Sequence, residues 1–243
     1  MKVIIAKDAA EIARRGADLF EQVIQEKPDC TLGLATGSSP IGLYQELIAR
    51  CKAGKLNFSQ VHTINLDEYV GLEGTHPQSY RYFMDSQLFD HINIDKANTF
   101  VVKGTGDIAE NLKEYNGKLE QTQTDLQLLG VGPDGHLGFN EPGDCLMDEA
   151  HEEVLDESTI EANKRFFARK EDVPTKALTM GMGGIMRAKR LVMIASGHKE
   201  EAMRRLLLEK TIDPHCPCTF LRLHADATVI LEKSLADAIG YQG

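Results

Sequence analysis

Long apolar runs are missing from this sequence of 243 residues, and their absence excludes several classes of protein. No stretch approaches the roughly 20 apolar residues that a membrane-spanning helix needs. Residues 1–20 contain no apolar core of a secretory signal peptide, because charged residues follow the short run Met1–Ala6 directly. We therefore expect a cytoplasmic protein that does not bind a membrane.

Runs of basic residues and a cysteine framework are also missing. The chain has 27 Lys and Arg against 37 Asp and Glu, and the net charge of -10 argues against binding to nucleic acid. The five cysteines are an odd number, and Cys216-Pro-Cys218 has no second pair with which to form a zinc site. We therefore expect reduced thiols and no metal.

Repeats, low-complexity tracts and linkers are absent as well, so a single domain over residues 1–243 is predicted. Apolar runs alternate with segments of helical periodicity, a pattern typical of an α/β fold with a mostly parallel sheet. The expected strands are residues 3–6, 31–35, 61–66, 99–102, 126–131, 191–195 and 228–231. The expected helices are residues 8–25, 41–51, 78–89, 108–120 and 199–208, with a last one from 233. Residues 143–157 are expected to be irregular, 158–167 partly helical, and 178–189 glycine-rich with a short helix.

Three titratable residues, Asp134, His136 and Glu141, follow the expected strand at 126–131. Open α/β folds bind their ligands at the carboxyl ends of such strands. A histidine between two carboxylates can be oriented by one and have its pKa set by both, which suits acid/base chemistry near neutral pH. The alternative is an ordinary turn, because Asp-Gly is a common turn pair and a histidine often only satisfies backbone groups.

A second loop, Thr36-Gly37-Ser38-Ser39-Pro40, joins the strand at 31–35 to the next helix. Glycine frees the backbone, the hydroxyls donate hydrogen bonds, and backbone N–H groups at a helix N-terminus attract anions. The P-loop pattern of nucleotide triphosphatases is absent, so a simple phosphate ester is the favoured ligand. The alternative is an ordinary capped turn.

Two acids, Asp67 and Glu68, follow the strand at 61–66, and two cations lie further along the chain. A buried carboxylate at this edge could remove a proton from carbon, although an aspartate there is as often a helix or turn cap. Arg165 lies in Ala-Asn-Lys-Arg-Phe-Phe, and Lys199 lies where a strand passes into a helix. Either cation could pair with a phosphate, or could be a solvated surface charge.

Taken together, these segments resemble the glucosamine-6-phosphate deaminases of the glucosamine/galactosamine-6-phosphate isomerase family. The matching segments are ATGSSP (35–40), NLDEYVGL (65–72), GVGPDGHLGFNEPG (130–143), ANKRFF (162–167), LTMGMG (178–183), SGHK (196–199) and LRLHADATVIL (221–231). They run in order across nearly the whole chain. The resemblance implies a modified Rossmann-like three-layer fold. It also implies conversion of glucosamine 6-phosphate and water to fructose 6-phosphate and ammonia, without a cofactor.

The resemblance also implies a role for each site residue. Asp67 matches the base that moves a proton between C2 and C1 of the opened sugar. His136 matches the residue that opens the pyranose ring, accompanied by Asp134 and Glu141. The residues that match the phosphate ligands are Thr36, Gly37, Ser38, Ser39, Arg165 and Lys199.

One segment departs from the family pattern. After the Asn-Glu-Pro-Gly motif the family usually carries Ser-Arg-Thr, and allosteric members use this region to bind N-acetylglucosamine 6-phosphate. Here the corresponding positions read Asp144, His151 and Glu153. Acids repel a phosphate, so no such activation is predicted.

Several alternatives stay open from the sequence. Nothing fixes the C4 epimer, so galactosamine 6-phosphate is a second candidate substrate. A 6-phosphogluconolactonase would share the fold, although the intact LDEYVGL segment argues for the deaminase. A non-catalytic sugar-phosphate sensor would need a DNA-binding helix-turn-helix, for which the chain has no spare residues. The protein could be a monomer or a homo-oligomer.

Overall fold

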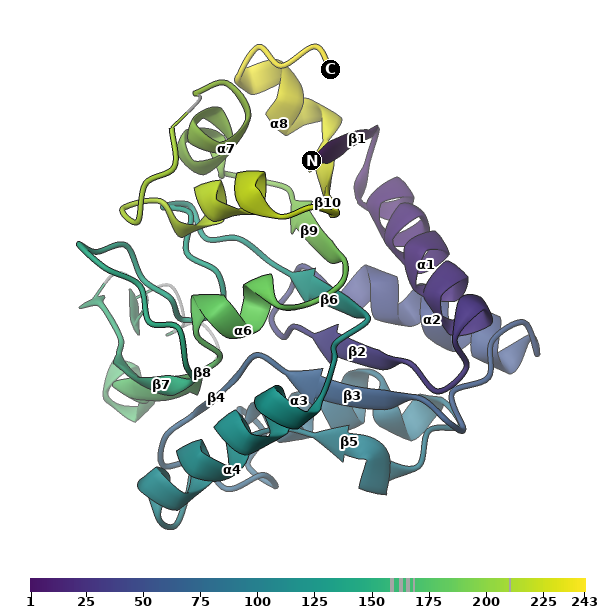
Figure 1. Ribbon diagram of the computed structural model, residues 1–243, viewed down its shortest axis with the longest axis vertical. Coiled ribbons are helices and arrows are strands. Elements are labelled where there is room, and N and C mark those ends of the chain that lie inside the picture. The colour runs from purple at the N-terminus through teal and green to yellow at the C-terminus, as the bar shows by residue number, and fades with distance from the viewer. Residues whose placement is uncertain (158–159, 162–163, 165–166, 168, 210) are drawn as a thin grey trace.

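A seven-stranded sheet in the order β1-β10-β9-β6-β2-β3-β5 forms the centre of the computed structural model, which describes residues 1–157, 160–161, 164, 167, 169–209 and 211–243 (Figure 1). All of its strand pairs are parallel. Its strands are β1 (Lys2–Ala6), β2 (Thr31–Leu34), β3 (His62–Asn65), β5 (Thr99–Phe100), β6 (Leu126–Leu129), β9 (Leu191–Ala195) and β10 (Ala227–Glu232). The predicted α/β fold with a mostly parallel sheet is confirmed.

Helices cover both faces of this sheet. Figure 1 shows α4 and α6 in front of it and α2 behind it. All five residues of β9 are buried, as expected for a parallel strand with helices on both sides. The helices are α1 (Ala9–Glu26), α2 (Ile41–Lys52), α3 (Tyr80–Gln87), α4 (Ile108–Gln121), α6 (Met182–Met186), α7 (Glu200–Leu207) and α8 (Lys233–Ala238), with a 3₁₀ helix at Pro217–Leu223. As expected, Asp8 caps α1, and its carboxylate accepts a hydrogen bond from the N–H of Glu11.

A second sheet of three antiparallel strands was not expected from the sequence. It consists of β4 (Asp67–Tyr69), β8 (Lys176–Thr179) and β7 (His151–Val154), in the order β4-β8-β7. The prediction that residues 143–157 are irregular was therefore wrong for residues 151–154, and β8 was missed. The reason is physical: β7 has the sequence His-Glu-Glu-Val and β4 begins Asp-Glu, and neither shows the β-branched alternation by which a strand is recognised.

Smaller differences concern the ends of elements. The helix expected at 78–89 is the shorter α3, followed by a 3₁₀ turn at Phe89–His91, and β5 ends two residues before the expected strand does. Most of the expected partial helix at 158–167 lies outside the described residues.

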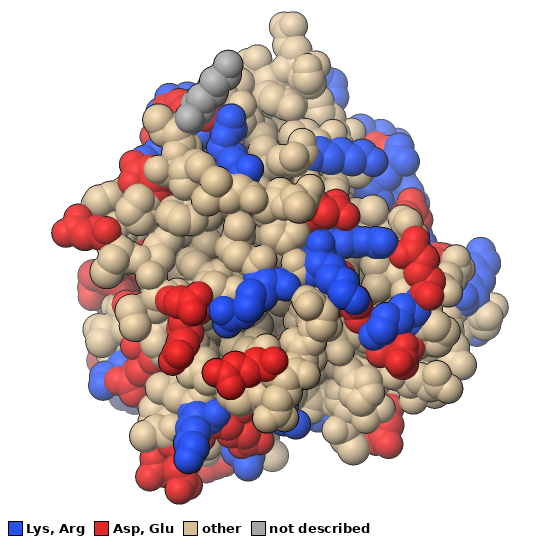
Figure 2. Space-filling view, viewed as in Figure 1, with Lys and Arg blue, Asp and Glu red and all other residues tan. Residues whose placement is uncertain are grey.

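On the face shown in Figure 2, basic and acidic side chains lie interspersed among uncharged ones. Over the described residues, no helix combines the length and apolar character needed to traverse a bilayer.

Candidate active site

A pocket of about 500 Å³ opens at the carboxyl ends of β2 and β6. The strands that follow β2 in the chain, β3 and β5, lie between β2 and one edge of the sheet. The later strands β6, β9 and β10 lie on the other side of β2. The loops that follow β2 and β6 therefore part from one another and leave a crevice, which is where open α/β sheets bind ligands. The walls come from these two loops, from β4, and from the start of α3 and of α7.

One end of the pocket is suited to an anion. Thr36, Gly37, Ser38 and Ser39 all line it, and they lead directly into the N-terminus of α2. Gly37 has a φ of +88°, a left-handed conformation that residues with a side chain rarely adopt. Lys199 lines the same pocket from the N-cap position of α7. Arg165, the other expected phosphate ligand, lies outside the described residues.

The loop after β6 brings Asp134, His136 and Glu141 together, as the sequence predicted. The Nδ1 atom of His136 lies 2.8 Å from Oδ1 of Asp134 and 3.6 Å from Oε2 of Glu141. The same Asp134 oxygen accepts a hydrogen bond of 3.1 Å from the main-chain N–H of His136. Because both carboxylates lie on the Nδ1 side of the ring, Nε2 is the ring nitrogen available to exchange a proton with a ligand.

Two glycines make this tight arrangement sterically possible. A Cβ atom at Gly132 would lie 2.3 Å from the Nδ1 atom of His136. Gly135 has a φ of +96° and packs closely on its other side against the sulfur of Cys216. Any larger residue at either position would displace the histidine or the loop that carries it.

The electrostatic setting favours a protonated histidine. Burial alone would lower the pKa of His136, but the contacts with the Asp134 and Glu141 carboxylates outweigh it and raise the pKa above its ordinary value. Burial alone would raise the pKa of Asp134, but the contact with His136 outweighs it and lowers the pKa below its ordinary value. The pair therefore supports an imidazolium next to a carboxylate at neutral pH.

The carboxyl group of Asp67 has a raised pKa, in contrast to that of Asp134. Asp67 is the first residue of β4 and only 5% of its surface is exposed. Burial raises its pKa to about 8, the charge of Glu68 adds to this, and His136 acts against it. A carboxyl group with such a pKa can both accept and return a proton near neutral pH, as a base acting on a carbon acid must.

Glu68, to which no role was given from sequence, anchors the base to a neighbouring helix. One carboxylate oxygen accepts hydrogen bonds from the N–H groups of Tyr69 (2.8 Å) and Tyr80 (2.9 Å), and the other from that of Arg81 (3.0 Å). Tyr80 and Arg81 begin α3, so Glu68 satisfies N–H groups that a helix leaves unpaired. Burial nevertheless raises the pKa of Glu68 to about 7.

An aromatic wall beside Asp67 was also missed from the sequence. It consists of Tyr69, Tyr80, Phe139 and Phe167, all of which line the pocket. The rings of Tyr80 and Phe139 are parallel within 2°, with centroids 6.1 Å apart, and Tyr69 lies 4.9 Å from Tyr80. The wall lowers the local polarity, which strengthens electrostatic interactions inside the pocket.

Among the described residues, one group could hold a metal ion: the ligand atoms of Asp134, His136 and Glu141 lie within 4.8 Å of one another. The arrangement equally suits the proton transfer described above. The expectation of a metal-free protein stays a prediction.

Comparison with known proteins shows the family of the chain. Residues 6–230 match the family described as glucosamine-6-phosphate isomerases/6-phosphogluconolactonase. A glucosamine-6-phosphate deaminase from Clostridium beijerinckii is 47% identical over 241 residues, covering 98% of this chain and 100% of the relative. One from Shewanella woodyi is 46% identical over 244 residues, covering 98% of this chain and 91% of the relative.

Solved structures give the same result. A monomeric glucosamine-6-phosphate deaminase superposes with a TM-score of 0.94 and 39% identity, covering 98% of this chain and 99% of that one. A 6-phosphogluconolactonase from Thermotoga maritima superposes with a TM-score of 0.75 over 95% of this chain and 98% of that one. Its identity of 19% shows a shared fold and nothing further.

The proximity of Glu68 to Asp67 gives a testable prediction. Replacing Glu68→Gln removes a neighbouring negative charge, so the pKa of Asp67 should fall below about 8. Titration of the Asp67 carboxyl carbon by NMR measures this. Glu73→Gln makes the same charge change at an exposed position and should leave the Asp67 pKa as in the wild type. An unchanged Asp67 pKa in Glu68→Gln would show that the two carboxylates do not interact.

Proposed function

Since the chain belongs to the family of glucosamine-6-phosphate isomerases and 6-phosphogluconolactonases, we propose that it converts glucosamine 6-phosphate and water to fructose 6-phosphate and ammonia. The observation that carries the proposal is that one pocket combines three parts. These are an anion site at the start of α2, a histidine held by carboxylates, and a buried carboxylate with a raised pKa. Each part serves a different step of this reaction.

The anion site binds the phosphate of the substrate. We assign this to Thr36, Gly37, Ser38, Ser39 and Lys199, and, from the family resemblance, to Arg165. Backbone N–H groups at a helix N-terminus together with cations compensate the phosphate charge. Because the phosphate does not react, its binding energy serves to position C1 and C2 at the other end of the sugar.

Ring opening is assigned to His136. The C1–O5 bond breaks, the ring oxygen gains a proton, and the hydroxyl on C1 loses one, which leaves an aldehyde at C1. A histidine with a raised pKa holds the proton that the ring oxygen of the sugar needs, and the Asp134 and Glu141 carboxylates beside Nδ1 favour the protonated imidazole.

Proton transfer between carbons is assigned to Asp67. Its carboxylate takes the proton from C2 and returns it to C1, while the aldehyde oxygen O1 gains a proton and the ammonium nitrogen loses one, so that C1 becomes a hydroxymethyl group and C2 a protonated imine. Water then adds to C2 and ammonia leaves, which gives fructose 6-phosphate. A single base with a pKa near 8 can perform both halves of the transfer.

Finer properties follow from the same comparisons. The names of the relatives favour glucosamine over galactosamine 6-phosphate, and the monomeric relative with a TM-score of 0.94 supports a monomer. We also infer a single-domain cytoplasmic enzyme of amino-sugar catabolism that needs no cofactor. Its partner is a small phosphorylated amino sugar.

The assay that tests the proposal compares three substrates without added metal. Ammonia should be released from glucosamine 6-phosphate, and turnover of galactosamine 6-phosphate should be at least tenfold slower, because losing one hydrogen bond in a site built for it costs about 1–3 kcal/mol. Hydrolysis of 6-phosphogluconolactone should be absent. Lactone hydrolysis without ammonia release would contradict the proposal.

The assignment of the base is tested by Asp67→Asn. Since general base catalysis contributes about 10²–10⁴-fold, kcat should fall by at least 100-fold. Binding of a non-reacting hexose phosphate, measured by calorimetry, should stay within about threefold because the phosphate site is untouched. Asp90→Asn changes an exposed aspartate that pairs with Lys96, and this variant should behave as the wild type. A near-normal kcat for Asp67→Asn would refute the assignment.

Activation by N-acetylglucosamine 6-phosphate is expected to be absent. Asp144 is fully exposed, and His151 contacts Glu153 at 3.1 Å, so the acidic character of this segment persists in the fold. Steady-state rates should follow a hyperbola in substrate and should not change when the acetylated sugar phosphate is added. A sigmoidal curve made hyperbolic by that compound would overturn this expectation.

A further inference from the structure

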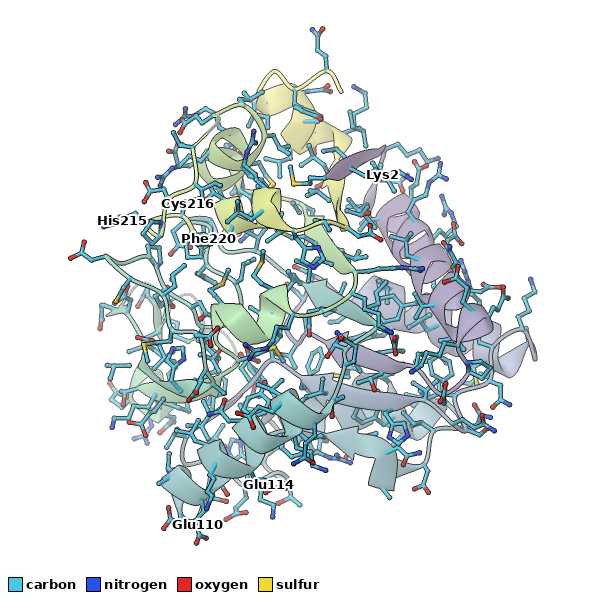
Figure 3. All side chains as sticks on the ribbon, viewed as in Figure 1. Lys2, Glu110, Glu114, His215, Cys216 and Phe220 are labelled. Atoms are coloured by element: carbon cyan, nitrogen blue, oxygen red, sulfur yellow. The ribbon has the colours of Figure 1, made fainter. Side chains whose placement is uncertain are left out.

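Two buried thiols lie in contact behind the loop that carries Asp134 and His136. The sulfur atoms of Cys216 and Cys218 are 3.6 Å apart, and neither residue has any exposed surface. Both are free thiols. They flank Pro217 at the entrance to the 3₁₀ helix, where Figure 3 shows Cys216 next to His215 and near Phe220.

The pair touches the loop at Gly135, the residue between Asp134 and His136. The main-chain N–H of Cys218 donates a hydrogen bond of 2.8 Å to the carbonyl of Gly135. A Cβ atom built on Gly135 would lie 2.5 Å from the sulfur of Cys216 and 3.2 Å from that of Cys218. The two cysteines therefore pack against the main chain at Gly135, whose two neighbours in the chain are Asp134 and His136.

The two thiols are not equivalent. The contact with the Cys218 thiol lowers the pKa of Cys216, burial acts against this, and the guanidinium of Arg205 assists it. The same contact raises the pKa of Cys218 above its ordinary value. Cys216 is thus the thiol that ionises first, and Cys218 is placed to attack it once it is oxidised.

We propose that Cys216 and Cys218 form an oxidation site at which a peroxide converts the two thiols to a disulfide and thereby displaces the Gly135 main chain. The thiolate of Cys216 attacks one peroxide oxygen, the O–O bond breaks, and a sulfenic acid forms as hydroxide leaves. Cys218 then attacks that sulfur, the S–O bond breaks, and water leaves. Two thiols lose two electrons and two protons, and hydrogen peroxide is reduced to two molecules of water.

The size of the movement explains why the loop should respond. A disulfide brings the sulfur atoms to about 2.0 Å, so they must approach by about 1.6 Å from the present 3.6 Å. Both sulfur atoms lie within contact distance of a Cβ position on Gly135, so a movement of either sulfur changes its packing against the Gly135 main chain. A displacement of about 1 Å in a catalytic group can reduce turnover about 100-fold. Disulfide formation is independent of the proposed function, whereas its effect on turnover rests on the roles proposed for Asp134 and His136.

The experiment treats the whole protein with hydrogen peroxide, alkylates the remaining thiols after unfolding, and maps them by mass spectrometry. The expected result is a disulfide linking Cys216 and Cys218 within one peptide. In parallel, kcat for glucosamine 6-phosphate should fall about 100-fold, and a dithiol reductant should restore it. Cys216→Ala and Cys218→Ala should each lack the reversible loss. Cys145→Ala, which removes an exposed thiol, should remain as sensitive as the wild type.

The outcomes separate the parts of the proposal. If both thiols remain free after peroxide treatment, the oxidation site is refuted, and this measurement on the wild type needs no variant to fold. A disulfide that leaves kcat unchanged refutes the coupling to the Gly135 loop. If the untreated protein shows no ammonia release, the proposed function fails while the mapped disulfide still decides the oxidation site.

Discussion

The parallel pairing of β2 with β6 is the constraint on which the rest of the structure depends. The register places Leu32 beside Leu126 and Gly33 beside Gln127. Just before β6, the Asp125 carboxylate accepts a hydrogen bond of 2.9 Å from the N–H of Thr31 and pairs with the exposed Lys27 and Lys189. Because the chain leaves these two strands in opposite directions, their loops diverge, and the crevice between them is lined by the Thr36 loop, Asp67, Asp134, His136 and Lys199.

Burial and neighbouring charges shift the pKa values of two aspartates in that crevice in opposite directions. Asp134 keeps a lowered pKa because it contacts His136, whereas Asp67 has a raised pKa because it is buried and lies next to Glu68. Carboxylates whose environments push their pKa values apart take different roles in acid/base catalysis. The aromatic wall strengthens the contrast, because it replaces water on one side of Asp67 by rings.

The sequence predicted the parts of the site that follow parallel strands, because an apolar run ending in glycine and polar residues has a distinctive pattern. The loops at Thr36 and His136 were found in this way, and the structure brings them together. The second sheet could not be found, because β7 and β8 pair across more than twenty residues without a hydrophobic alternation. The role of Glu68 depends on the N–H groups of Tyr80 and Arg81, which come twelve and thirteen residues later in the chain. No local pattern reveals such a contact.

Leu66 joins the two sheets, since β3 ends one residue before it and β4 begins one residue after it. Its N–H donates a hydrogen bond of 3.2 Å to the carbonyl of Leu34, and its carbonyl accepts one of 2.7 Å from Met180. Leu34 lies two residues before Thr36, and Leu66 lies one residue before Asp67. The main-chain distance between the Thr36 loop and Asp67 is therefore fixed by main-chain hydrogen bonds. Under the roles proposed for the Thr36 loop and Asp67, this fixed distance selects the length of the sugar, and a sugar phosphate with one carbon fewer would present the wrong carbon to the carboxylate.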